Sequence, residues 1–321
     1  MSATEADLDF TLAGFAGHVG SDPDCIVMMP PIIMPMHLAI DATPCLVRPR
    51  SGAPVFLKIY APDMLPFIDL DAAVAAATRA GQCGIGPAVI AHDADRSAVL
   101  FDFLAPDAWR MASRADLETI AVRSAIFAAK RAWHRSGLLG RTRSPFEVIR
   151  AYRERINSLA ERTPSASTLP LAFHTLADWT ERIERGIAAA GIDLAPLHGE
   201  NALSNVMLGP ANEVRLVDFD QAANGDPLYD VGAFCLEFCS FDDEIEAAVE
   251  LYLGHSDQRA VARAKLYMIV DDFLWGCWAL LAHATSPRAT TVEFYKYAQN
   301  RLLRGTYWLG VWDADSLLRR A

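Results

Sequence analysis

Apolar residues are spaced in two different ways along the chain. In residues 24–60, and again in 88–101, short apolar runs are separated by Pro, Gly and Asp, which is typical of strands joined by turns. The clearest strand is Pro54–Tyr60, which carries Lys58 in its interior. Asp69–Gly81 combines strong helix formers with acidic residues at its start and a glycine at its end, so it is predicted to be a helix.

The most apolar tract of the chain, CIVMMPPIIMPMHLAI, occupies residues 25–40 and contains Pro30, Pro31 and Pro35. Because proline interrupts a helix, this tract does not predict a membrane-spanning segment. It is predicted to form two short strands with an irregular connection. The first 20 residues fit either a helix or a loose arm.

Beyond residue 105 the apolar spacing becomes helical, with one hairpin inside residues 197–221. The predicted helices are Ala115–Arg135, Pro145–Ala160, Ala172–Ala190, Ala233–Gly254, Arg259–Ala284 and Thr291–Leu309. The pattern therefore predicts an α+β fold with two lobes. The smaller, β-rich lobe would span residues 1–105 and the larger, mainly helical lobe residues 106–321.

Composition narrows the classes of partner. The 321 residues carry a net charge of −11, which argues against non-specific binding to nucleic acid or to an anionic membrane. The six cysteines form no CxxC pair, so a zinc site is not expected. Because no secretory signal is recognised, we expect reduced thiols and a cytoplasmic location.

Candidate chemistry is concentrated in the hairpin LHGENALSNVMLGPANEVRLVDFDQ, residues 197–221. Pairing Leu208 with Val214 would bring Asn205 beside Asp218, because residues that flank two paired strands end opposite one another. An amide oxygen and a carboxylate form a hard oxygen site that suits Mg²⁺. Taken singly, Asn and Asp more often cap turns, so only their order and spacing favour the metal site.

Glu200 and His198, which precede the hairpin strands in the sequence, extend this pattern. Glu200 precedes Asn205 by five residues and would reach the same space, and His198 could brace its loop. The pattern His198-Gly199-Glu200-x-x-x-x-Asn205, followed by Val217-Asp218-Phe219-Asp220, is similar to that of aminoglycoside phosphotransferases and choline kinases. Residues 226–230, DPLYD, resemble the Asp-Pro-x-x-Asp segment of the same kinase-like superfamily.

This resemblance implies a protein-kinase-like fold and a role for each matching residue. Glu200 stands where the family has the catalytic Asp that accepts the proton of the substrate hydroxyl. Asn205 and Asp218 would hold Mg²⁺, and Asp230 would anchor the catalytic loop.

The N-terminal lobe would then bind ATP. Lys58 would contact the α- and β-phosphates, and its partner acid would come from the following helix, where Asp71 or Asp69 is the candidate. Phe103, in the connector after the last N-terminal strand, is assigned to the nucleotide as well. Without the order of motifs, Lys58 would be taken for a solvated strand lysine.

Trp275 and Trp278 are three residues apart, so both indoles lie on one helix face. Such a pair is usually core packing, but aromatic faces also bind quaternary ammonium groups. The segments FLWGCW at 273–278 and YKYAQ at 295–299 closely resemble the C-terminal region of choline/ethanolamine kinases. In that family two Trp residues and the Tyr of the Tyr-Ala-Gln segment line the choline site, which maps Tyr297 beside the two Trp residues.

The same resemblance assigns the acidic residues Glu237 and Asp220 to the acceptor. The implied reaction transfers the γ-phosphate of ATP to choline or a related amino alcohol. The partner would be a small cationic alcohol, with no nucleic acid and no membrane span, and the protein a monomer or homodimer. Two alternatives stay open: a phosphotransferase for an aminoglycoside or another small hydroxylated substrate, and a degenerate kinase-like protein that binds without transfer.

The pattern departs from the family in two places. Glu200 replaces Asp, and Gly199 stands where choline kinases usually have Asn. A base displaced by about 1 Å can cost on the order of a hundredfold in rate, although Glu can still accept a proton. The region MMPPIIMPMHLA also lacks the glycines of a phosphate-covering loop, and its prolines remove amide donors.

Overall fold

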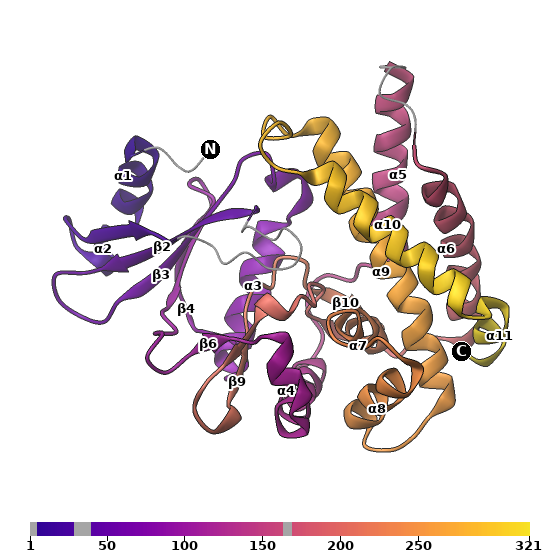
Figure 1. Ribbon diagram of the computed structural model, residues 1–321. Coiled ribbons are helices and arrows are strands. Elements are labelled where there is room, and N and C mark those ends of the chain that lie inside the picture. The colour runs from indigo at the N-terminus through magenta and orange to yellow at the C-terminus, as the bar shows by residue number, and fades with distance from the viewer. Residues whose placement is uncertain (1–4, 29–39, 163–168) are drawn as a thin grey trace. The chain divides into compact units, whose positions relative to one another are not determined.

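The computed structural model describes residues 5–28, 40–162 and 169–321 (Figure 1). The chain forms two compact units. Unit 1 comprises Met1–Ala112 and Ser204–Ala222, and unit 2 comprises Ser113–Leu203 and Ala223–Ala321. Most of the proline-rich tract, including the stretch predicted to lack a phosphate-covering loop, lies outside the described residues.

Unit 1 contains an antiparallel five-stranded sheet in the order β1-β2-β3-β5-β4. The strands are β1 (Asp24–Val27), β2 (Ala42–Arg48), β3 (Val55–Tyr60), β4 (Val89–Asp93) and β5 (Ala98–Asp102). Side chains alternate between the two faces of a strand, so Leu57 and Ile59 of β3 point away from Lys58 and Tyr60. Leu57 and Ile59 pack against the N-terminal helices α1 (Glu5–Gly14) and α2 (Ala16–Val19).

The opposite face of the sheet packs against α3 (Leu70–Gln82), which lies close to the predicted range. Asp69 caps this helix by accepting a hydrogen bond from the backbone N–H of Ala72 at 3.2 Å. Val74 of α3 joins Tyr60 and Val99 in a buried cluster on this face. The face that carries Lys58 is therefore closed by a helix with small apolar side chains.

Unit 1 also contains the predicted hairpin, as part of a three-stranded sheet in the order β6-β8-β9. Its strands are β6 (Arg110–Met111), β8 (Val206–Leu208) and β9 (Val214–Leu216). Leu208 pairs with Val214 as the sequence predicts. Short 3₁₀ turns occur in the described residues at Leu65–Phe67, Arg114–Glu118, Leu203–Asn205 and Pro210–Asn212.

Unit 2 is built around the long buried helix α9 (Gln258–Thr285) (Figure 1). Six other helices of the described residues pack on it: α5 (Pro145–Arg162), α6 (Leu171–Ala190), α7 (Pro227–Cys235), α8 (Asp242–Leu253), α10 (Phe294–Val311) and α11 (Ala314–Arg320). Unit 2 also contains α4 (Ile120–His134), β7 (Ala195–Leu197) and β10 (Ala223–Gly225). The strands β7 and β10 pair antiparallel.

Two predicted helices are wrong in their extent. The helix predicted over 233–254 is two helices, because Phe241 is extended and Glu244 caps a new start by accepting hydrogen bonds from Ser240 N and Phe241 N. The helix predicted over 115–135 starts with a 3₁₀ turn and becomes α-helical at Ile120, since Thr119 is extended. Local capping therefore outweighs helical periodicity before α8.

The predicted α+β class agrees with an antiparallel, sheet-rich N-terminal region and a mostly helical remainder. The lobe boundary predicted at residue 105 stays a prediction, because the compact units also divide the chain around the hairpin. Within residues 5–28, 40–162 and 169–321, no helix combines the length and the apolar character needed to cross a membrane.

Candidate active site

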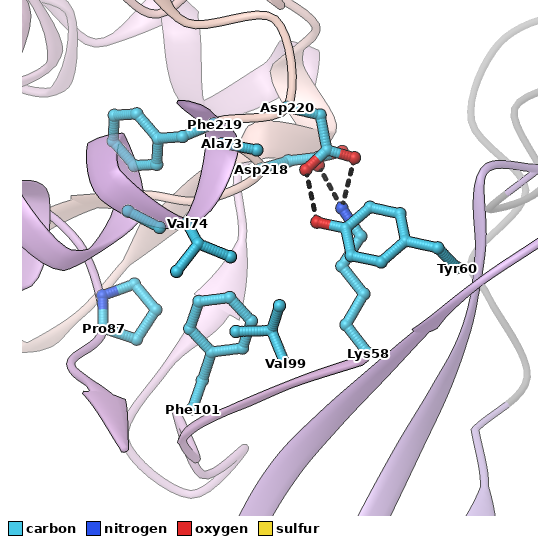
Figure 2. Close-up of a pocket in the computed structure, with 11 residues that line it drawn as sticks. Lys58, Tyr60, Ala73, Val74, Pro87, Val99, Phe101, Asp218, Phe219 and Asp220 are labelled. Carbon is cyan, nitrogen blue, oxygen red and sulfur yellow. Dashed lines mark hydrogen bonds and ion pairs between the residues drawn. The ribbon is translucent and has the colours of Figure 1, made fainter. Parts of the chain in front are cut away.

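Lys58 lies at the centre of a polar cluster in unit 1 (Figure 2). Its Nζ is 2.5 Å from Oδ1 of Asp218 and 2.7 Å from Oδ2 of Asp220. The other oxygen of Asp220 accepts a hydrogen bond of 2.7 Å from the hydroxyl of Tyr60. One cation therefore meets two carboxylates whose residues are separated from it by 160 and 162 positions.

Burial and the paired charges together set the charge state of this cluster. Burial alone would lower the pKa of Lys58, but the carboxylates of Asp218 and Asp220 hold it well above its usual value. Burial raises the pKa of Asp220 to about 6, against the opposing influence of the Lys58 ammonium. Lys58 is thus a charged lysine at neutral pH, and Asp220 is an acid with weakened ionisation.

The backbone of Asp218 is in the left-handed region, with φ of 70°. Few non-glycine residues adopt this conformation, and those that do are often found at functional sites. The residue before it, Val217, donates its N–H to the carbonyl oxygen of Asn205 at 3.0 Å. The end of the hairpin therefore joins the backbones of the two segments that carry the predicted metal ligands.

The chemistry of Asn205 and Asp218 fits Mg²⁺. They offer one amide oxygen and one carboxylate, and Mg²⁺ usually takes one or two protein carboxylates while phosphates and water complete its shell. In the part of the chain that the structure describes, no group of three His, Cys, Asp or Glu side chains is arranged to hold a metal ion. The fit therefore depends on the amide of Asn205 and on phosphate oxygens.

An apolar hollow lies next to the Lys58 cluster (Figure 2). Its walls come from α3, from β5 and from the segment before β4, with the side chains Ala73, Val74, Ala77, Pro87, Val99 and Phe101. Phe101, not the predicted Phe103, lines this hollow. Phe103 follows the end of β5 and is half-buried.

The structure pairs Lys58 differently from the prediction. Asp71 is exposed on α3, and Asp69 caps that helix. The carboxylates on Lys58 are instead Asp218 and Asp220, which follow β9. Asp220, which the resemblance assigns to the acceptor, uses both of its oxygens within unit 1.

In unit 2, the loop that carries Glu200 is fixed by a buried carboxylate. Asp230 accepts hydrogen bonds from the backbone N–H groups of His198 at 2.7 Å and Gly199 at 3.1 Å. His198 Nδ1 in turn accepts the backbone N–H of Glu200 at 3.3 Å. Glu200 itself is 8% exposed, and the hydrogen bonds from the backbone N–H groups of residues 198–200 hold its loop.

Helix α4 contacts the same loop and its anchor Asp230 with two buried polar side chains. His134 Nε2 lies 3.0 Å from Asp230, and Lys130 Nζ lies 2.5 Å from Oδ1 of Asn201, whose amide group donates to Asp230. Burial would raise the pKa of Asp230, but the contact with His134 and the nearby positive charges hold it below its usual range. Burial lowers the pKa of Lys130 to about 8.

The predicted aromatic residues lie together where α9 packs on α10. The ring centroids of Trp275 and Trp278 are 5.5 Å apart, and those of Trp278 and Tyr297 are 6.3 Å apart, both edge to face. Trp278 and Tyr297 are buried, while Trp275 is half-buried. Phe294 packs against the ring of Trp278 at 5.8 Å.

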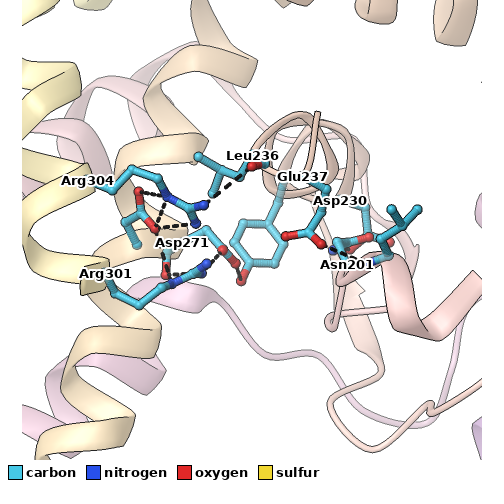
Figure 3. Close-up of polar contacts among 10 residues, drawn as sticks. Asn201, Asp230, Leu236, Glu237, Asp271, Arg301 and Arg304 are labelled. Atoms are coloured by element: carbon cyan, nitrogen blue, oxygen red, sulfur yellow. Dashed lines mark hydrogen bonds and ion pairs between the residues drawn. The ribbon is translucent and has the colours of Figure 1, made fainter. Parts of the chain in front are cut away.

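Charged residues of α9 and α10 form a network of ion pairs (Figure 3). Arg301 and Arg304 pair with Asp271 and Asp272, and the guanidinium of Arg301 lies 5.8 Å from the ring of Tyr297. Glu237 accepts a hydrogen bond of 2.8 Å from the backbone N–H of Leu203, three residues after Glu200. One oxygen of Glu237 therefore stabilises the loop that carries Glu200.

The model of the phosphotransferase enzyme family matches residues 41–267, more than half of the chain. The chain belongs to this family. No curated protein matches the sequence.

Several solved structures resemble this phosphotransferase at low sequence identity. A choline/ethanolamine kinase family protein from Mesorhizobium loti is 19% identical, with 98% of this chain and 97% of that chain covered and a TM-score of 0.77. The choline kinase LicA from Streptococcus pneumoniae is 16% identical, with coverages of 94% and 100% and a TM-score of 0.74. The macrolide 2'-phosphotransferase MphH from Brachybacterium faecium is 18% identical, with coverages of 88% and 98% and a TM-score of 0.54. The predicted kinase-like fold is confirmed.

Two residues of the phosphotransferase site escape prediction from sequence. Tyr60 is two positions after Lys58 and therefore on the same strand face, which is a signal that the sequence does contain. Phe101 lies on the same face because it pairs with Phe56, two positions before Lys58, and this pairing is seen only in the structure. The pairing of Asp220 with Tyr60 has no local signal.

Proposed function

We propose that this phosphotransferase transfers the γ-phosphate of ATP to the hydroxyl of choline or a related amino alcohol, in the presence of Mg²⁺. The observation that supports nucleotide binding is the charged Lys58, which is buried beside Asp218. Asp218 follows Val217, whose N–H bonds to the backbone of Asn205 at the same end of the hairpin. A buried ammonium placed beside a carboxylate suits a phosphate chain with its cation.

The nucleotide would be bound by unit 1. Lys58 would donate hydrogen bonds to phosphate oxygens, and Phe103 stays a candidate for contact with the base. Asn205 and Asp218 would hold Mg²⁺, which would neutralise charge on the phosphate oxygens. The choline kinase LicA has also been solved in complex with AMP, which supports a nucleotide for this chain.

The acceptor would be bound by unit 2. The aromatic faces of Trp275, Trp278 and Tyr297 would attract a quaternary or protonated amine through cation–π interactions. Glu237, near the same helices, would add negative charge while it supports the loop of residues 200–203. Two structural neighbours with TM-scores above 0.7 are named as choline kinase or as a choline/ethanolamine kinase family protein, which favours this acceptor class.

Glu200 would accept the proton of the acceptor hydroxyl as the oxygen attacks phosphorus. The bonds of Asp230 and His198 to the loop backbone hold the carboxylate on a fixed support. Such support favours a general base, because proton transfer requires a well-positioned acceptor. His198 would act through the loop and not on the substrate.

Another acceptor is the main competing possibility, because the family match ends at residue 267 and the aromatic residues lie beyond it. Family membership therefore leaves the acceptor open. A polyhydroxylated acceptor such as an aminoglycoside would use the same Lys58, Asn205 and Asp218.

The test is release of ADP from Mg-ATP with choline, ethanolamine and a panel of aminoglycosides, measured at several concentrations of each. Saturable release with choline or ethanolamine is the expected result. Release only with another alcohol would keep the phosphotransferase and reject the amino alcohol. If no acceptor gives release and Mg-ATP does not raise the melting temperature, the protein is a kinase-like binding protein.

A further inference from the structure

Helix α3 offers no acidic partner to Lys58. The α3 residues that line the hollow beside this lysine are Ala73, Val74 and Ala77, none of which carries a polar group. Asp71 of the first turn is exposed. The side chain that fixes Lys58 must therefore come from another element.

Asp220 has the geometry for this task. Its carboxylate is 4% exposed and bridges two side chains of β3, with Oδ2 2.7 Å from Lys58 Nζ and Oδ1 2.7 Å from the hydroxyl of Tyr60. Lys58 and Tyr60 are two residues apart and share one face of the strand. The lysine also lies 4.7 Å from the centre of the Tyr60 ring.

Asp218 is less suited to hold Lys58 during the reaction. Its side chain is 28% exposed, and in the proposed function its oxygens would be shared with Mg²⁺. An ammonium has three N–H donors, so contact with Asp220 leaves donors that can reach phosphate oxygens. A lysine held only by Asp218 would lose part of its support when the metal binds.

We propose that Asp220, fixed by Tyr60, is the positioning residue that aims Lys58 at the nucleotide phosphates, in place of an acid from α3. This inference rests on the proposed function, because it requires a nucleotide. It assigns Asp220 to the binding of the nucleotide, whereas the sequence resemblance assigns it to the acceptor.

The test compares Asp220→Asn and Tyr60→Phe with the wild type. We expect the affinity for a non-hydrolysable ATP analogue with Mg²⁺, measured by calorimetry, to fall about tenfold or more in Asp220→Asn and by a smaller factor in Tyr60→Phe. The KM for ATP should rise in parallel, while the KM for the acceptor stays unchanged. A purely structural defect would not separate the two KM values in this way.

Tyr267→Phe is the matched control, because the Tyr267 hydroxyl donates to buried Asp226 at 3.0 Å in unit 2. It removes the same kind of bond and should leave nucleotide affinity unchanged. If Asp220→Asn does not fold, as judged by its melting curve, Tyr60→Phe decides the question, since it keeps the carboxylate.

Three outcomes would overturn the inference. Unchanged nucleotide affinity in folded Asp220→Asn and Tyr60→Phe would remove the role of Asp220 while leaving the proposed function intact. A loss of affinity in Asp71→Asn, with none in Asp220→Asn, would return the role to α3. A wild-type protein without nucleotide affinity would overturn the proposed function and this inference together.

Discussion

In the proposed function, Glu200 is the side chain on which phosphate transfer would depend most directly. Replacing it with Gln keeps its size and removes its ability to accept a proton. We expect kcat to fall by about 10²- to 10⁴-fold, the usual contribution of a general base, while affinity for Mg-ATP is retained. Steady-state kinetics and calorimetry on the same preparation measure both quantities.

Glu246→Gln is the control for this change, because Glu246 is an exposed acid on α8. It should leave both quantities unchanged. Transfer at the wild-type rate by Glu200→Gln would show that another group accepts the proton. Glu200→Asp is a further comparison, since Asp is the residue that the sequence resemblance implies at this position.

Asp230 makes a pH-dependent contribution to stability. Its pKa is depressed in the folded protein, so the stability that it adds is complete above the unfolded value of about 3.9 and is lost progressively as the pH falls from there through the folded value. Asp230→Asn should therefore lower the free energy of unfolding by roughly 3 kcal/mol at pH 7 and by less near pH 3. Urea unfolding at the two pH values measures this difference.

Asp178→Asn provides the comparison, because Asp178 is exposed on α6. Its effect should be small at both pH values. An equal loss of stability by Asp230→Asn at pH 7 and pH 3 would contradict an ionised, hydrogen-bonded carboxylate at position 230.

At the scale of elements, the proposed function assigns the choice of acceptor to side chains of the helices α9 and α10. Trp275→Ala removes the most exposed ring of the aromatic cluster. We expect the KM for a quaternary amine to rise about tenfold or more, because a desolvated cation–π contact contributes up to about 2 kcal/mol. The KM for a polyhydroxylated alcohol should change less, and kinetics with both acceptors measures the difference.

Trp179→Ala is the matched control, since Trp179 is a half-buried Trp on α6 that packs on Arg182. It should leave both KM values near those of the wild type. Equal effects of Trp275→Ala on the two acceptors would mean that the aromatic cluster is packing and not a cation site.

Elements defined by alternation or periodicity could be predicted from the sequence, and those defined by caps could not. The strand with Lys58, the pairing of Leu208 with Val214 and the helix after Asp69 follow from local patterns. The break before α8 depends on hydrogen bonds from Ser240 and Phe241 to Glu244, which override an apolar pattern that would continue the helix.

The candidate site shows the same division. Asn205 and Asp218 are connected by a hairpin, so their relation could be predicted from their spacing. The bond between Tyr60 and Asp220 joins residues 160 positions apart and arises only from tertiary packing. The sequence therefore contained the residue types of the site but not the partner of Lys58.

At the scale of the whole molecule, the candidate residues are divided between the two units. Unit 1 carries Lys58, Asn205 and Asp218, and unit 2 carries Glu200 and the aromatic cluster. The net charge of −11 is compatible with a cationic acceptor, because an acidic protein attracts cations at long range.

The most direct measurement is ³¹P NMR of a reaction that contains the protein, Mg-ATP and choline. We predict a new phosphomonoester resonance that grows as the γ-phosphate resonance of ATP disappears. This resonance should be absent or strongly delayed with Glu200→Gln. Loss of ATP that yields only inorganic phosphate, or no change in either resonance while the folded protein binds Mg-ATP, would contradict transfer to choline.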